Sequence, residues 1–133
     1  MRKIEHIGIA VKDISSACNI YERLLNAELY KTEYVDSEGV KTAFFRSGPN
    51  KIELLEATTA DSPISKFIEK RGEGIHHIAF DVEDIEAEMT RLKSQGFVLL
   101  SDKPKPGADN KLVCFIHPKS TNGVLIELCQ SKP

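Results

Sequence analysis

Two histidines stand at matching places in a sequence that occurs twice. His6 opens the segment HIGIAVKDI, and His77 opens HIAFDVEDI 71 residues further on. The repeat extends further, because KIELLEA and VLIELCQ share an Ile-Glu-Leu core that contains Glu53 and Glu127. The glutamate follows its histidine by 47 residues in the first half and by 50 in the second. Each half therefore supplies one imidazole and one carboxylate, which predicts a duplicated site.

These four side chains have the chemistry of a divalent metal site. Two imidazoles with two carboxylates bind borderline cations such as Co, Mn, Ni, Fe or Zn, and an octahedral ion keeps positions for water or substrate. A lone histidine on a strand is more often structural than a ligand, but the repeated His-to-Glu interval reverses that expectation. If the halves pack about a pseudo-twofold axis, His6, Glu53, His77 and Glu127 are predicted to converge on one open, catalytic centre.

Strand alternation predicts the direction of these side chains. His6 shares its face with the small residues Gly8 and Ala10, which leaves space in front of the imidazole. Glu53 and Glu127 alternate with apolar neighbours, so both carboxylates project away from the apolar face of their strands. The pattern places all four groups on the side of the sheet that is not packed on helices.

Each half is predicted to have the element order βαβββ, which makes the fold α+β. The first half has strands at about 4–11, 27–35, 40–47 and 51–57 with a helix at 13–26; the second has strands at 77–82, 97–101, 111–117 and 123–129 with a helix at 84–95. Residues 58–74 are predicted to form a short helical tether anchored by Ile64, Phe67 and Ile68. The two modules, about 1–57 and 75–133, are expected to share one domain of 133 residues.

Composition excludes several classes of partner. The net charge of −2 and the absence of a basic stripe argue against nucleic acid. No apolar run approaches the ~20 residues of a membrane helix, and the strand that starts near Ile4 leaves no room for a cleavable signal. Cys18, Cys114 and Cys129 are odd in number and lack a CxxC pair, so they are expected to be reduced core thiols. The prediction is a cytoplasmic protein.

The other two histidines, His76 and His117, are expected to have roles other than metal ligation. His76 has the wrong strand parity to join His77, which favours packing or support of the site. His117 precedes Pro118 at a strand end and is not expected to be a ligand.

The paired modules with HIGIAV, HHIAF and a late IEL resemble the vicinal oxygen chelate (glyoxalase/bleomycin resistance/dioxygenase) superfamily across essentially the whole chain. Two long segments, DSPISKFIEKRGEGIHHIAFDV at 61–82 and HPKSTNGVLIELCQ at 117–130, closely resemble the methylmalonyl-CoA epimerase family. The resemblance implies two modules paired by pseudo-twofold symmetry around an open metal-binding barrel, a divalent ion that is often cobalt, an acyl-CoA substrate and a homodimer. It carries metal-ligand roles onto His6, Glu53, His77 and Glu127.

The resemblance also implies a reaction, the interconversion of (2R)- and (2S)-methylmalonyl-CoA by removal and return of the C2 proton. Glu127 and Glu53 are the candidate catalytic groups for the two faces. Glu127 ranks first as base, because some family members place Gln where Glu53 stands. Some also carry a second carboxylate at the position filled here by Thr42. For the CoA phosphates, the candidate contacts are loop lysines: Lys103, Lys105, Lys111 and Lys119.

Two other functions fit the same pattern. A glyoxalase I-like lyase uses a similar four-ligand layout to move a proton beside a carbonyl of a glutathione adduct. A metal-free module of the same scaffold sequesters small molecules, but it has no need of four convergent ligands. An extradiol dioxygenase fits less well, because it needs a two-His, one-carboxylate iron site with three open positions.

Overall fold

The sequence repeat corresponds to two structural modules with the same order of elements. The computed structural model describes residues 1–133. It divides into a first module, His6–His76, and a second module made of Met1–Glu5 and His77–Pro133. Strand β1, Lys3–Ala10, therefore begins in the second module and continues into the first.

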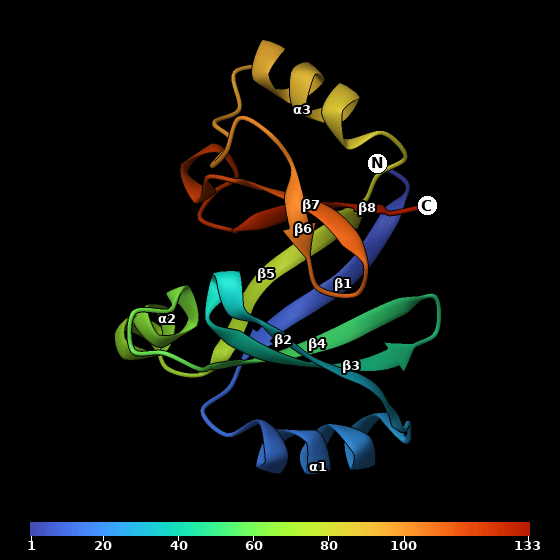
Figure 1. Ribbon diagram of the computed structural model, residues 1–133, viewed down its shortest axis with the longest axis vertical. Coiled ribbons are helices and arrows are strands. Elements are labelled where there is room, and N and C mark those ends of the chain that lie inside the picture. The colour runs from blue at the N-terminus through green and yellow to red at the C-terminus, as the bar shows by residue number, and fades with distance from the viewer. The chain divides into compact units, whose positions relative to one another are not determined.

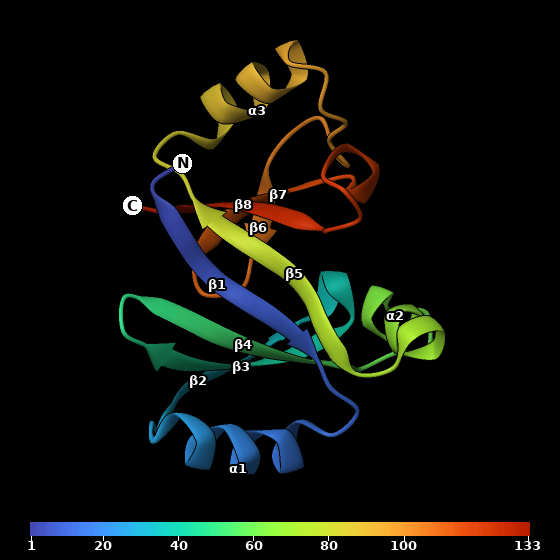
Figure 2. The same cartoon turned by 180° about the vertical axis from the view of Figure 1, so that it is seen from behind.

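The first module is a four-stranded sheet with two helices packed on it (Figure 1). Its strand order is β2-β3-β4-β1, with β1 parallel to β4 and the other neighbours antiparallel. Figure 2 shows β1 and β4 side by side. After β1 come α1 (Ile14–Leu25), β2 (Leu29–Val35), the 3-10 turn η1 (Asp36–Glu38), β3 (Val40–Ser47), β4 (Asn50–Ala57) and α2 (Pro63–Arg71).

The second module repeats this arrangement, with strand order β5-β8-β7-β6 and β5 parallel to β8. Its elements are β5 (Gly74–Asp81), α3 (Ile85–Ser94), β6 (Lys105–Gly107), β7 (Lys111–Ile116), the 3-10 turn η2 (Pro118–Ser120) and β8 (Ile126–Ser131). Helix α3 packs on β7 and β8, as α1 packs on β3 and β4 (Figure 1). No helix is long and apolar enough to cross a membrane.

Both long helices begin in the same way. Asp13 caps α1 and Asp84 caps α3, each by accepting backbone N–H groups of the first turn. The first helical N–H of α1, from Ile14, donates to a Glu56 carboxylate oxygen at 2.7 Å. The Ile85 N–H donates to the Gln130 side-chain oxygen at the same distance. The last strand of each module thus holds the start of its helix. The observed bounds of α1 and α3 lie within one residue of the predicted helices at 13–26 and 84–95, which confirms both helices.

One apolar core lies between helix and sheet in each module. In the first module it comprises Val11, Ile14, Ala17, Ala43, Phe45 and Leu54. In the second it comprises Val82, Ile85, Met89, Leu92, Cys114, Ile116 and Leu128. Burying each large side chain of this kind contributes roughly 1.5–3 kcal/mol. Because these cores occupy the helical side, the other face of each sheet is available for polar groups.

Helix α2 covers part of that other face in the first module. Ile64 is 2% exposed and packs with Ala10, Val40 and Leu55. Phe67 and Ile68 pack against the same cluster, so the three predicted anchors of the tether are confirmed.

The strand predicted at 97–101 is wrong. That segment makes only an isolated bridge between Leu99 and Ile116, and the paired strand β6 starts at Lys105. Pro104 and Pro106 have no backbone N–H to donate to a continuous strand ladder. Before them, Ser101 Oγ donates a local hydrogen bond to the Lys103 carbonyl at 2.9 Å. Pro106 is tolerated because β6 is an edge strand.

Candidate metal centre

The first module brings His6 and Glu53 together. Parallel pairing sets Gly8 of β1 beside Glu53 of β4, and His6 lies two residues earlier on the same face. The imidazole Nε2 is 3.2 Å from the carboxylate Oε1. Both residues are 5% exposed. This pair is the first half-site.

The second module repeats the pair with His77 and Glu127. Here Ala79 of β5 takes the position of Gly8, beside Glu127 of β8. His77 Nε2 lies 3.2 Å from Glu127 Oε1, and the two residues are 4% and 7% exposed. The two half-sites therefore agree in strand pairing, distance and burial, and small residues beside both glutamates leave room for the imidazoles.

A phenylalanine ring lies edge-on to each imidazole. Phe44 pairs with Glu53 across β3 and β4, and its ring meets His6 edge-on with centroids 6.4 Å apart. Phe115 pairs with Glu127 across β7 and β8 and meets His77 in the same way at 5.9 Å. The prediction from sequence missed both rings. Their separation of 71 residues, equal to that of the histidines, was the available signal.

The chemistry of the donors fits a divalent cation. Each half-site presents an imidazole nitrogen and a carboxylate oxygen in a buried place, and such mixed N and O donors suit borderline ions. A buried carboxylate is costly without a positive or hydrogen-bonding partner, which a cation beside it would provide. That both half-sites hold one ion stays a prediction.

Three other residues singled out in the sequence have different environments. Thr42 is 1% exposed, and its hydroxyl donates to the Glu33 carbonyl at 3.4 Å, so this chain has a neutral group there. His76 packs edge-on against Phe67 at 5.0 Å, in line with the expected packing role. His117 precedes η2 and its Nδ1 accepts the Lys119 N–H at 3.0 Å, which places it at a turn, as expected.

The fold agrees with the result of comparison with known proteins. A model of the glyoxalase/bleomycin resistance protein/dioxygenase superfamily matches residues 5–115, and the chain belongs to this family. The superfamily resemblance and the α+β fold of two βαβββ modules are thereby confirmed.

Several similar proteins within this family are epimerases that act on acyl-CoA substrates. The chain is 44% identical to an ethylmalonyl-CoA/methylmalonyl-CoA epimerase of Cereibacter sphaeroides, over 96% of this chain and 97% of that protein. It matches the crystal structure of the Mycobacterium tuberculosis methylmalonyl-CoA epimerase with a TM-score of 0.95 and 37% identity, over 98% and 89% of the two chains. A variant of the Streptomyces coelicolor epimerase in complex with 2-nitronate-propionyl-CoA also matches, with a TM-score of 0.95, 34% identity and coverage of 100% and 99%.

Proposed function

We propose that the chain is an isomerase that interconverts the 2R and 2S forms of methylmalonyl-CoA. The observation that carries the proposal is the duplicated buried His–Glu pair, present with the same 3.2 Å contact in both modules. Epimerisation needs one proton-transfer group for each face of a carbon atom, and a duplicated site can supply two. The relatives named as methylmalonyl-CoA epimerases, which match nearly the whole chain, support the same substrate.

We further propose that His6, Glu53, His77 and Glu127 together hold one divalent cation. The support is the matched donor set and the burial of both pairs. Cobalt is the proposed ion, with Mn, Ni, Fe and Zn as alternatives that satisfy the same donors. When bound, the cation would supply positive charge for the thioester oxygen as negative charge develops on it.

The protein groups then divide the proton transfer between them. The C2 hydrogen lies between a thioester carbonyl and a carboxylate, so its removal leaves an enolate stabilised by delocalisation. Glu127 is proposed to accept the C2 proton on one face, and Glu53 to return a proton to the other. Because a cation favours the ionised carboxylate, each glutamate must loosen from the cation while it carries the proton. One turnover exchanges the protonation states of the two glutamates, and solvent or the reverse reaction restores them.

The ring contacts support this division of roles. Each glutamate lies beside an imidazole that packs edge-on against Phe44 or Phe115. Such packing restricts where the carboxylate can point, and proton transfer to a defined face requires a defined direction. The 2-nitronate-propionyl-CoA bound to the Streptomyces coelicolor relative contains a planar anionic group, as the proposed enolate does.

Incubation of each methylmalonyl-CoA stereoisomer in deuterated water tests the proposal. Conversion to the other stereoisomer should be accompanied by deuterium at C2, detected by mass spectrometry. Absence of label uptake, together with turnover of a methylglyoxal–glutathione adduct, would instead assign a glyoxalase I-like reaction. A purified protein that contains no metal and binds small molecules without turnover would assign the metal-free binding module.

We also propose the cellular location and the oligomeric state of the enzyme. We infer a cytoplasmic protein, because none of its three cysteines forms a disulfide. We infer a homodimer from the family resemblance and from large apolar side chains on the surface, which include Ile4, Ile20, Leu24 and Ile75. The two modules are proposed to work as one domain, and light scattering of the purified protein would test the dimer.

A further inference from the structure

An ion pair between a buried carboxylate and a partly buried lysine lies on the same face of β8 as the proposed base. Lys111 Nζ is 3.9 Å from Glu5 Oε2, and their side chains are 13% and 4% exposed. Lys111 also donates to Ser131 Oγ at 2.8 Å. Ser131, Cys129 and Glu127 alternate along β8, so all three project from one face. Lys111, a candidate phosphate contact in the sequence, is instead held within the second module.

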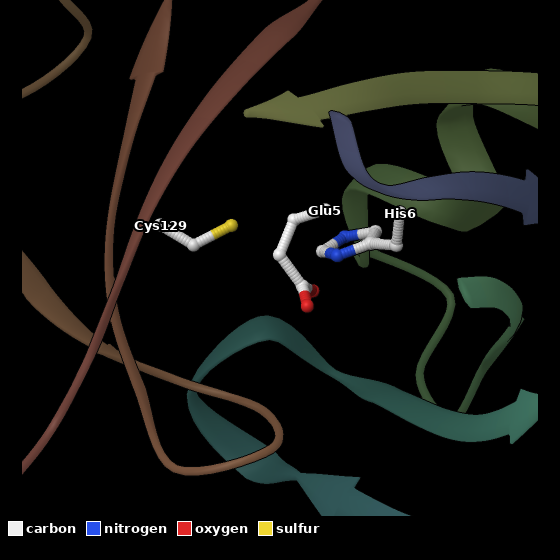
Figure 3. Close-up of side chains that lie close together, drawn as sticks. All are labelled: Glu5, His6 and Cys129. Atoms are coloured by element: carbon white, nitrogen blue, oxygen red, sulfur yellow. The ribbon is translucent and has the colours of Figure 1, made fainter. Parts of the chain in front are cut away.

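Glu5 extends into the second module from strand β1. It is 3% exposed, and its carboxylate lies within 4.8 Å of the Cys129 thiol. Figure 3 shows that thiol pointing toward Glu5. At the start of the same strand, Arg2 Nε donates to Asp81 Oδ2 and the Arg2 backbone N–H donates to the Asp81 carbonyl, both at 2.9 Å. Two ion pairs thus hold residues 2–5 on the second module.

The βαβββ architecture does not require the Glu5–Lys111 pair. The positions that match Glu5 and Lys111 in the first module, 71 residues away, are His76 and Val40. Val40 is 6% exposed in an apolar cluster, and His76 packs on Phe67. Equivalent strands therefore form with uncharged packing. Because burying two charges costs solvation that their attraction only partly returns, stability alone does not explain the pair.

The place of Glu5 in the chain suggests another purpose. Glu5 directly precedes His6, so fixing the Glu5 side chain restricts the backbone that carries the His6 imidazole. The segment that ends at Glu5 belongs to the second module, whereas His6 pairs with Glu53 in the first. Holding Glu5 on the second module therefore restrains the residue that directly precedes this ligand.

We propose that Glu5 and Lys111 are positioning residues that hold His6 in the geometry needed for metal binding. This inference rests on the proposed function of the same site. Groups that orient metal ligands typically change metal affinity 10–100-fold when they are removed. The effect expected here is therefore on cation affinity and ligand geometry, before any effect on the chemical step.

The test compares Co(II) binding and its visible absorption spectrum in a set of variants of the full chain. Lys111→Met should weaken Co(II) binding by ~10-fold or more and shift the absorption bands. Lys111→Arg keeps the charge and should restore both to about the native values. Hydrogen exchange at the His6 amide should quicken in Lys111→Met without metal, because the backbone is released. Arg91→Met, which removes the exposed 2.9 Å pair with Glu88 in the same module, is the matched control and should change none of these.

A double variant, Glu5→Gln with Lys111→Met, protects the test against simple unfolding. It removes both charges of the pair, so it should fold even if one unpaired charge prevents folding of a single variant. Weak Co(II) binding by the folded double variant supports the positioning role. Native affinity, native spectrum and native exchange at His6 in that variant would overturn it. If the wild type binds Co(II) but does not epimerise the substrate, the proposed reaction fails while this comparison still stands.

Discussion

Replacement of Glu127 by glutamine tests the proton-transfer assignment with an almost isosteric change. One carboxylate oxygen becomes an amide NH2, and the remaining oxygen can still coordinate a cation. Loss of an acid–base group typically slows turnover by ~10²- to 10⁴-fold. This corresponds to about 2.7–5.4 kcal/mol in the barrier, at 1.36 kcal/mol for each factor of ten. We expect Glu127→Gln to keep its metal and lose turnover by this amount.

The structure predicts little loss of folding stability from the same change. Glu127 is 7% exposed and lies 3.2 Å from His77 Nε2, a contact that an amide can also make. A neutral glutamine avoids the cost of burying an ionised group. The free energy of unfolding of the metal-free variant should therefore lie within about 1 kcal/mol of the wild-type value, or exceed it. Urea denaturation of the metal-free proteins measures this difference. A stable but inactive variant would locate the loss in the chemical step.

Glu53→Gln is the companion variant, because the repeat gives Glu53 the same contact with its histidine and nearly the same burial. If Glu53 is mainly a ligand, this variant should keep its metal and appreciable activity. If each glutamate serves its own face, both variants should stop epimerisation, while one of them still exchanges the C2 proton of a single stereoisomer with deuterium. Complete loss of epimerisation and of exchange in Glu53→Gln, with metal bound, would refute the ranking and make Glu53 an essential base.

Three further predictions concern the metal, a helix start and a thiol. Chelation should abolish activity and Co or Mn should restore it, and His6→Ala or His77→Ala should weaken metal binding by ~10-fold or more; full activity of the metal-free protein would contradict the mechanism. Gln130→Ala removes the acceptor for the first N–H of α3 and should lower the free energy of unfolding by about 1 kcal/mol in urea denaturation. Burial raises the pKa of the Cys114 thiol in the folded protein. The contribution of the buried neutral thiol to stability is therefore present below the unfolded-state pKa and is lost as pH rises through the folded-state pKa. Iodoacetamide near pH 8 should therefore label Cys114 much more slowly in the native protein than in urea, as mass spectrometry of peptides would show.

The sequence alone determined the repeat and most of its elements. Helices α1 and α3 were predictable because Asp13 and Asp84 are strong N-cap residues placed before apolar residues of helical spacing. The directions of His6, Glu53, His77 and Glu127 were predictable because side chains alternate strictly along a strand. These signals are local, and the repeat presented each of them twice.

Only the tertiary structure decided the pairings between strands. Strand β7 pairs with Leu99 through one isolated bridge and then with β6 from Lys105, on the far side of Pro104. The alternation of residues within 97–101 carries no information about that pairing. The ring of Phe115 reaches His77 from another strand, and Lys111 meets Glu5 across 106 residues of chain. Such contacts depend on sheet order and register, which arise when distant segments bury their apolar faces together.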